Sequence, residues 1–341
     1  MTSKERISSI FNRQGNGSIG FWTGNPHKDT TEKYSKIIGG EGKESIYSHL
    51  DDDCRWFSGE SCYKHPQGKP LFDITGGKIK ASLGEGGVFA ETTDLKDVES
   101  HPWPNPDYLD FSRIISEAEK HRDRFIFSGM WSPFYHIVAD YFGMENYFVK
   151  MYTEPAMVEA VTEKVLDFYE AANEKYFSEA GHVTDSFFFG NDFGTQRDTL
   201  ISPDMFRKFV LPGMKRLMKV ARKYNKKILL HSCGSIYKVI PDLIDAGIDA
   251  LHPLQAKAAN MDADSLAKFK NDIAFVGGVD TQDLLVNATP QEVKDDVYRL
   301  VETLGPNIVI SPSHEAILPN VSWENVLAMR EAVYEINGKE E

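Results

Sequence analysis

Residues 227–235 read Lys-Ile-Leu-Leu-His-Ser-Cys-Gly-Ser, an apolar run that ends in polar side chains and a glycine. A short run of branched aliphatic residues bounded by turn residues is typical of a strand buried in a parallel sheet. Similar runs recur along the chain, at 19–22, 124–129, 186–190, 250–254, 273–277 and 307–311. Long amphipathic stretches separate them, so the pattern indicates repeated βα units and a parallel sheet.

Helix boundaries support this rhythm. Ser202-Pro203 and Thr289-Pro290 pair a capping hydroxyl with a proline at the first turn, so they predict helices over 204–224 and 291–304. Gly181, Gly247 and Gly305 follow helical patterns, where a left-handed residue would end each helix.

The first 110 residues are less regular. An N-terminal helix, one barrel strand at 19–22 and an excursion with a β-hairpin are expected there, and regular βα units over 111–341. A length of 341 residues allows one large α/β barrel or two medium domains. No flexible linker or shift in composition marks a boundary, so the sequence favours a single domain over 1–341.

Composition narrows the classes of function. The 38 Lys and Arg against 51 Asp and Glu give a formal charge of −13, which disfavours nucleic acid as a partner. The three cysteines (Cys54, Cys62 and Cys233) are too few and odd in number for a disulfide framework. No signal peptide or membrane-spanning run is recognised. We therefore expect a cytoplasmic protein with free thiols at Cys54 and Cys62 that acts on a small molecule.

Polar residues follow most of the expected strands, where a parallel barrel places its catalytic groups. The sharpest pair is His231 and Cys233, because alternate residues at a strand end can offer imidazole and thiolate to one zinc ion. His314 follows a later strand and would complete a site of three ligands with an open fourth position, with Glu315 as a substitute ligand. The alternatives are a buried strand histidine beside a packed cysteine, and a His314 that only hydrogen-bonds substrate.

Other strand ends carry further candidates. Asp192 and Gln196 follow an apolar strand, where burial would tune the carboxylate for acid–base or orienting work, although a helix-entry turn explains them too. Gly277-Gly278 before Asp280 offers close backbone approach, or a turn before a capped helix. His136 is interpreted as a residue of the pocket or the core. The residues expected to bind substrate are Asn25, His27, Trp131, Asn191, His252, Gln255, Asp280 and Glu315.

At these residues the sequence resembles the uroporphyrinogen decarboxylase superfamily, which also contains zinc-dependent methyltransferases acting on methylcobamides. The resemblance is densest over 191–326. Its landmarks are residues 190–196 (GNDFGTQ), 202–203 (SP), 209–212 (FVLP), 230–235 (LHSCGS), 245–255 (DAGIDALHPLQ), 277–280 (GGVD) and 324–326 (ENV). It implies a (β/α)8 TIM barrel with its pocket at the C-terminal mouth.

The superfamily divides between metal-free decarboxylation of tetrapyrrole carboxylates and zinc-assisted methyl transfer. True decarboxylases carry Arg-Gln-Ala-Gly-Arg-Tyr near the N-terminus, whereas residues 21–28 read Phe-Trp-Thr-Gly-Asn-Pro-His-Lys. Both arginines are missing, and only Lys28, Arg55 and Arg197 are candidates to compensate the charge of a polycarboxylate.

The methyltransferases hold zinc with a His-x-Cys pair and a later cysteine, near whose position this chain has His314. One thiolate instead of two would leave zinc more electrophilic by about one unit of ligand charge. The resemblance therefore implies a zinc enzyme that moves a methyl group between a small methylated substrate or thiol and a corrinoid. Zinc would be held by His231, Cys233 and His314, and Asp192 and Gln196 would orient the substrate.

A separate corrinoid protein and a homodimer are the partners expected. The alternatives are a metal-independent decarboxylase of a uroporphyrinogen-like tetrapyrrole that uses Asp192, and a non-catalytic barrel that binds a tetrapyrrole or corrinoid.

Overall fold

The computed structural model describes residues 1–15, 17–77, 85–314 and 316–338. Eight parallel strands form one sheet in the order β1-β8-β7-β6-β5-β4-β3-β2. The strands are β1 (Gly20–Phe21), β2 (Cys54–Ser58), β3 (Phe125–Gly129), β4 (Ser186–Gly190), β5 (Lys227–His231), β6 (Ala250–His252), β7 (Ala274–Val279) and β8 (Ile308–Pro312). The backbone N–H of Asp53 donates to Phe21 O between the two end strands, so the sheet curls into a nearly closed barrel. The (β/α)8 barrel that the sequence predicted is confirmed.

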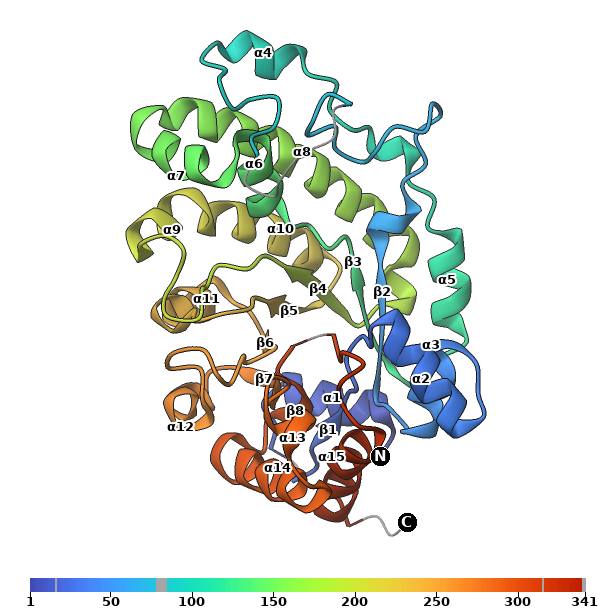
Figure 1. The fold of residues 1–341 in the computed structure, drawn as a ribbon. Helices are drawn as coiled ribbons and strands as arrows, with labels where there is room; N and C mark the ends of the chain where they lie inside the picture. Colours follow the sequence, from blue (N-terminus) through green and yellow to red (C-terminus); the bar gives the residue numbers. More distant parts are fainter. Residues whose placement is uncertain (16, 78–84, 315, 339–341) are drawn as a thin grey trace.

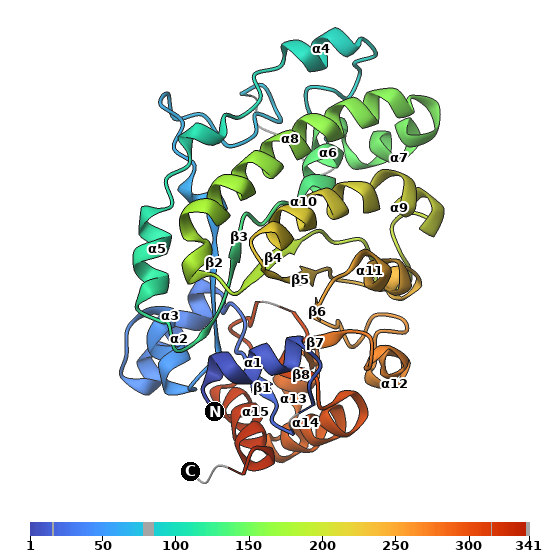
Figure 2. The same ribbon diagram turned by 180° about the vertical axis from the view of Figure 1, so that it is seen from behind.

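Helices surround this barrel, and the N-terminus lies near α15, away from the excursion that carries α4 (Figures 1 and 2). The helices are α1 (Ser3–Phe11), α2 (Lys28–Ile38), α3 (Gly42–His49), α4 (Leu95–Ser100), α5 (Ser112–Glu119), α6 (Phe134–Phe142), α7 (Met144–Thr153), α8 (Pro155–Ala180), α9 (Pro203–Phe209), α10 (Leu211–Lys223), α11 (Ile240–Ala246), α12 (Ala263–Leu266), α13 (Leu284–Asn287), α14 (Pro290–Leu304) and α15 (Trp323–Ile336). Among these described helices, none has both the length and the apolar character that a membrane crossing requires.

Two apolar layers follow from the alternation of side chains along each strand. Phe188, Leu229 and Val309 belong to an inner cluster, which Ile7 and Phe11 of α1 close at one end. The intervening residues, such as Phe187 and Leu230, join a larger cluster with the surrounding helices. His231 and His252 continue the inward-facing series of β5 and β6, which fixes where the polar end of the barrel begins.

The positions of most elements match the expectations closely. β4 and β5 have the expected bounds, and Ser202 and Thr289 cap α9 and α14 through their side chains. The single helix expected over 204–224 is wrong, because the chain breaks between α9 and α10 at Val210. Pro212 explains the break, since proline has no N–H to continue a helix and clashes with the preceding turn.

Two other expectations are wrong. Only Gly247 of the three terminating glycines is left-handed, while Gly181 and Gly305 have φ of −59° and −66°. In the first 110 residues one barrel strand was expected, and the described part contains two, β1 and β2. β2 was not recognised in the sequence because it contains the charged residue Arg55. Its guanidinium is buried by an ion pair with Glu44 of α3 at 2.8 Å, a partner that only the fold supplies.

Candidate active site

The C-terminal ends of β4, β5 and β6 are held in register beside one another. Gly190 pairs with His231, and His231 pairs with His252. Asp192 lies two residues beyond β4, and Cys233 lies two residues beyond β5. The sheet therefore brings together four polar side chains that are far apart in the sequence.

Three possible ligand atoms converge in this cluster. His231 Nε2 lies 3.4 Å from Cys233 Sγ and 3.2 Å from Asp192 Oδ1. All three of these atoms lie within 4.8 Å of one another, and among the described residues they form a group that could hold a metal ion. The backbone N–H of Cys233 also donates to Asp192 Oδ1 at 2.8 Å, which ties the β4 and β5 loops together.

The donor set fits zinc. Bonds of the usual lengths in a tetrahedron place neighbouring nitrogen, sulfur and oxygen ligands about 3.4–3.6 Å apart. The distances of 3.4 and 3.2 Å from His231 Nε2 are close to that spacing. A thiolate, an imidazole and a carboxylate are also ligand types that zinc accepts, so one ion would need only small adjustments of these side chains.

A cysteine–histidine nucleophile fits this arrangement less well. In a catalytic triad the carboxylate contacts the imidazole nitrogen that is remote from the nucleophile. Here Asp192 and Cys233 face the same nitrogen, Nε2, while Nδ1 lies 2.9 Å from His252 Nδ1. Because a carboxylate and a thiol both face His231 Nε2, the arrangement is better suited to a metal cation bound by all three side chains.

The electrostatics of the cluster favour an anionic Asp192. Burial raises the pKa of this carboxyl, but the hydrogen bond and charge of His231 and the Cys233 N–H outweigh burial and hold the pKa well below its usual range. Burial lowers the pKa of His136, against the opposing charge of Asp192. It lowers the pKa of the fully buried His252 further, which favours a neutral imidazole there.

A cavity of about 140 Å³ adjoins the cluster and is lined by Trp131, His136, Gly190, Asn191, Asp192 and His231. The Trp131 ring centroid lies 5.2 Å from that of His231, with the two planes at 53°. Gly190 leaves room for this indole, because a Cβ at 190 would lie 2.2 Å from Trp131 Cζ2. His136, which the sequence left open as a residue of the pocket or the core, lines this cavity.

Buried polar side chains fix the loop that carries Trp131. Asn191 accepts from the Tyr135 N–H at 2.9 Å and donates to Ser132 O at 3.2 Å. Glu60, which follows β2, accepts from the Ser132 N–H at 3.0 Å. Both the oxygen and the nitrogen of the Asn191 amide are therefore hydrogen-bonded to backbone groups. Glu60 supports the same loop, and its position could not be inferred from the sequence because β2 was not predicted.

A second cavity, of about 250 Å³, opens at the ends of β6, β7 and β8. Its lining residues are Gln255, Thr281, Gln282, Ser313, His314, Ala316, Leu318 and Asn320. Gln255 Oε1 accepts from the Gly234 N–H at 2.7 Å, so this cavity borders the loop that bears Cys233. His314 lines the second cavity, and its Nδ1 accepts from the Ala316 N–H at 3.2 Å. It is not part of the converging ligand group, so ligation by His314 stays a prediction.

The remaining predicted residues have other surroundings. His27 caps α2 by accepting from the Asp29 N–H, and Asn25 Oδ1 accepts from Lys43 Nζ. Gln196 is exposed on the β4 loop. His252 is fully buried. Glu315 lies outside the described residues.

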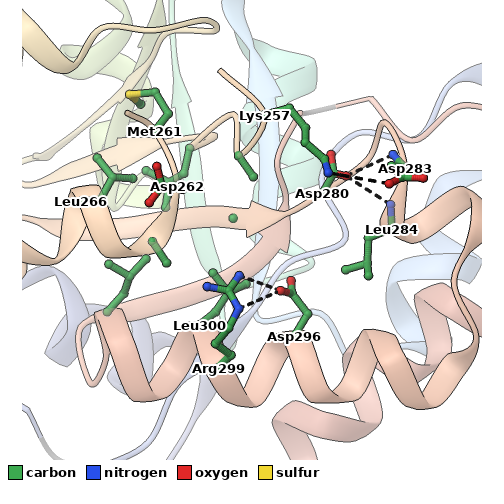
Figure 3. Close-up of a pocket in the computed structure, with 15 residues that line it drawn as sticks. Lys257, Met261, Asp262, Leu266, Asp280, Asp283, Leu284, Asp296, Arg299 and Leu300 are labelled. Carbon is green, nitrogen blue, oxygen red and sulfur yellow. Dashed lines mark hydrogen bonds and ion pairs between the residues drawn. The ribbon is translucent and has the colours of Figure 1, made fainter. Parts of the chain in front are cut away.

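Asp280 lies at the border of a third cavity, on the flank of the barrel between β7 and α14 (Figure 3). Its carboxylate accepts from the backbone N–H groups of Gln282, Asp283 and Leu284 at 3.0–3.2 Å. Lys257 Nζ lies 3.6 Å from the same carboxylate. These contacts make Asp280 the anchor of the loop that carries Thr281 and Gln282 to the second cavity.

Comparisons with known proteins agree with this fold. The family model for uroporphyrinogen decarboxylase (URO-D) matches residues 74–336. A methylated-thiol–coenzyme M methyltransferase from Methanosarcina mazei is 27% identical over 155 residues, which are 44% of this chain and 38% of that protein. The alignment thus spans well under half of that relative.

A solved structure described as a methyltransferase from Methanosarcina mazei superposes with a TM-score of 0.72, covers 99% of both chains and is 16% identical. At that identity the likeness shows the fold. Both of these proteins are described as methyltransferases. The family match covers most of the chain and confirms the resemblance seen in the sequence. The chain belongs to the uroporphyrinogen decarboxylase family.

Proposed function

We propose that this protein is a zinc-dependent methyltransferase that moves a methyl group between a small methylated substrate or thiol and a corrinoid. The observation that carries the proposal is the convergence of Asp192, His231 and Cys233 on one point at the barrel mouth. The methyltransferase names of the relatives support the reaction class. The corrinoid, and a protein that carries it, come from the resemblance.

Each residue of the cluster has a role in this proposal. His231, Cys233 and Asp192 would hold the metal, with His314 as the further ligand that the sequence predicts. Zinc bound there would supply Lewis-acid chemistry and favour the thiolate form of a thiol substrate. In the transfer, the methyl group leaves its donor without the bonding electron pair, and the acceptor supplies the pair for the new bond.

The two cavities suit a small substrate. Trp131 and His136 would pack against the methyl-bearing end of a substrate beside His231. Gln255, Gln282 and Ser313 offer amide and hydroxyl groups to orient the remainder.

Metal-free decarboxylation of a polycarboxylate is less well supported. The described residues that line the two mouth cavities include no lysine or arginine. Arg55, one of the cations considered for that task, is buried against Glu44. A substrate with many carboxylates requires compensating positive charge, which these cavities do not offer.

Elemental analysis of the purified protein tests the proposal. We expect about one zinc per chain in the native protein and its loss in both His231→Ala and Cys233→Ala. Cys62→Ala is the matched control, because Cys62 is a buried thiol on the 3-10 turn after β2. Full metal content in both site variants would refute the zinc site. Asp192→Ala and His314→Ala then decide which of these two side chains is a ligand.

Methyl transfer is tested separately by incubating the zinc-loaded protein with methylated thiols and reduced cobalamin. Formation of methylcobalamin, followed by its visible absorbance, is expected with the native protein and absent with Cys233→Ala. A zinc-loaded protein that transfers no methyl group from any donor tested would overturn the reaction while leaving the metal site in place.

A further inference from the structure

We propose that His252 is a positioning residue that accepts the Nδ1 hydrogen of His231, so that Nε2 of His231 is the nitrogen available to bind a metal beside Asp192 and Cys233. The inference rests on the proposed function, since it concerns how this chain prepares its metal ligand. It assigns to His252 a role inside the barrel wall in place of the contact with substrate that the sequence suggested.

The sheet places the two imidazoles against each other. His231 and His252 are paired residues on β5 and β6, and both follow inward-facing apolar positions. Their Nδ1 atoms are 2.9 Å apart, and their ring centroids are 5.0 Å apart. This distance is a hydrogen bond between two ring nitrogens, so one hydrogen lies between them.

Either His231 or His252 can be the donor of this hydrogen bond. If His252 donates, His231 Nδ1 is the acceptor, and the neutral His231 ring carries its own hydrogen on Nε2. If His231 donates from Nδ1, its Nε2 keeps a lone pair directed at Asp192 and Cys233, as a metal ligand requires. The second arrangement places the hydrogen of His252 on its own Nε2.

The surroundings of His252 indicate that the hydrogen bond of its Nδ1 to His231 is the reason for a histidine at this position. Its ring packs at 5.3 Å from both Trp22 and Phe188, and the residue is fully buried. Its Nε2 has no hydrogen-bond partner among the residues that the structure describes. A buried polar group without a partner is unfavourable for folding. An apolar residue would avoid this cost, which the bond to His231 offsets.

Partners of this kind orient metal-bound histidines by accepting from the ring nitrogen that does not bind the metal. A carboxylate or a carbonyl usually has this role. In this chain a second, buried imidazole has it. A neutral acceptor adds no negative charge to a site that already holds Asp192 and Cys233, so His252 orients the ligand without making the metal less electrophilic.

Zinc affinity, measured by competition with a chromogenic chelator, tests the role in the native protein, His252→Leu and His252→Asn. His252→Leu removes the acceptor, so we expect zinc affinity to fall by about 10- to 100-fold. His252→Asn can place an amide oxygen near the former Nδ1 and should retain most of the affinity. Equal affinity in the native protein and His252→Leu, or an equal loss in both variants, would overturn the inference.

The tautomer itself is measured on metal-free native protein by NMR with ¹⁵N-labelled histidine, assigned with His231→Gln. We expect hydrogen on His231 Nδ1, whether or not Nε2 carries a second hydrogen toward Asp192; a His231 Nδ1 without hydrogen would overturn the inference even if both variants fail to fold. The two tests also separate the inference from the proposed function. Native protein that binds no zinc contradicts the proposed function, whereas the tautomer measurement still decides the role of His252.

Discussion

Gly234 packs its backbone directly against that of Gly194, and a Cβ at 234 would lie 2.4 Å from the carbonyl carbon and oxygen of Gly194. This contact joins the loop after β5 to the loop after β4, next to Cys233 and Asp192. Gly234 also has a φ of 80°, in the left-handed region that favours glycine. The spacing of the ligand atoms therefore depends on two residues that have no side chain.

Gly234→Ala should weaken both the fold and the metal site. We expect a loss of about 2–4 kcal/mol in the free energy of unfolding, from left-handed strain and from the displaced loop together. Zinc affinity should fall as Cys233 moves away from Asp192. Urea unfolding and chelator competition measure the two effects.

Gly247→Ala is the matched control for this substitution. Gly247 has a φ of 95°, and a Cβ there would meet nothing within 4 Å. It should cost only about 1 kcal/mol of stability and leave zinc affinity unchanged. Equal effects of the two substitutions would contradict the role of the contact between the loops.

Gly190→Ala tests how Trp131 is placed beside His231. The new methyl group would overlap the indole, so we expect a loss of about 1–3 kcal/mol in stability and a displaced ring. In a Trp131→Ala background the same methyl group should cost much less, because the overlap is gone. Comparing the four proteins by urea unfolding gives the coupling between the two residues. Additive effects would show that Trp131 does not occupy the space beside Gly190.

The sequence predicted the barrel because strand and helix signals are local. Runs such as 186–190 and 227–231 carry their own hydrophobicity, and Ser202 and Thr289 carry their own capping oxygens. β2 was missed because its buried Arg55 depends on an ion pair with Glu44 of α3, and the sequence alone does not show that these residues meet. Pairing between distant segments leaves no local signal in a single sequence.

The candidate site divides in the same way. His231 and Cys233 were found because their spacing along one strand end places them together. Asp192 was recognised as polar at a strand end, but its closeness to His231 Nε2 depends on the β4–β5 register and on the glycine contact between the loops. Asn191 is occupied by hydrogen bonds to the segment after β3, and Asp280 by the backbone N–H groups of the turn that follows it, although both were expected to face substrate.

Asp52 should give the protein a measurable pH dependence of stability. Its carboxylate is fully buried and bonded to Thr23, and burial raises its pKa to about 7, against the opposing effect of the Thr23 hydrogen bonds. An unfolded Asp ionises near pH 4. The folded protein thus holds a proton that the unfolded chain has released, and the stabilisation from Asp52 is complete below about pH 4 and is lost as pH rises toward 7.

We therefore expect the free energy of unfolding to fall between pH 4 and pH 7 by up to about 1.4 kcal/mol per pH unit from this group, and Asp52→Asn to remove that slope. Asp107→Asn makes the same change of side chain at an exposed position and should leave the slope unchanged. Urea unfolding at several pH values measures all three proteins. Parallel pH profiles for the native protein and Asp52→Asn would contradict the prediction.

Cobalt substitution distinguishes a thiolate ligand at Cys233 from a cysteine that only lies nearby. Co²⁺ occupies zinc sites, and a tetrahedral site with one thiolate should show intense visible bands and a near-ultraviolet band from sulfur-to-metal charge transfer. Cys233→Ser keeps the size of the side chain but replaces sulfur with oxygen, so the near-ultraviolet band should disappear and metal affinity should fall by at least about 10-fold. Asp192→Asn removes the charge of the carboxylate and leaves sulfur in place, so it should weaken binding and keep that band. If the band persists in Cys233→Ser, the sulfur that binds the metal is not that of Cys233, and the convergence of this thiol with His231 and Asp192 would have to serve another chemistry.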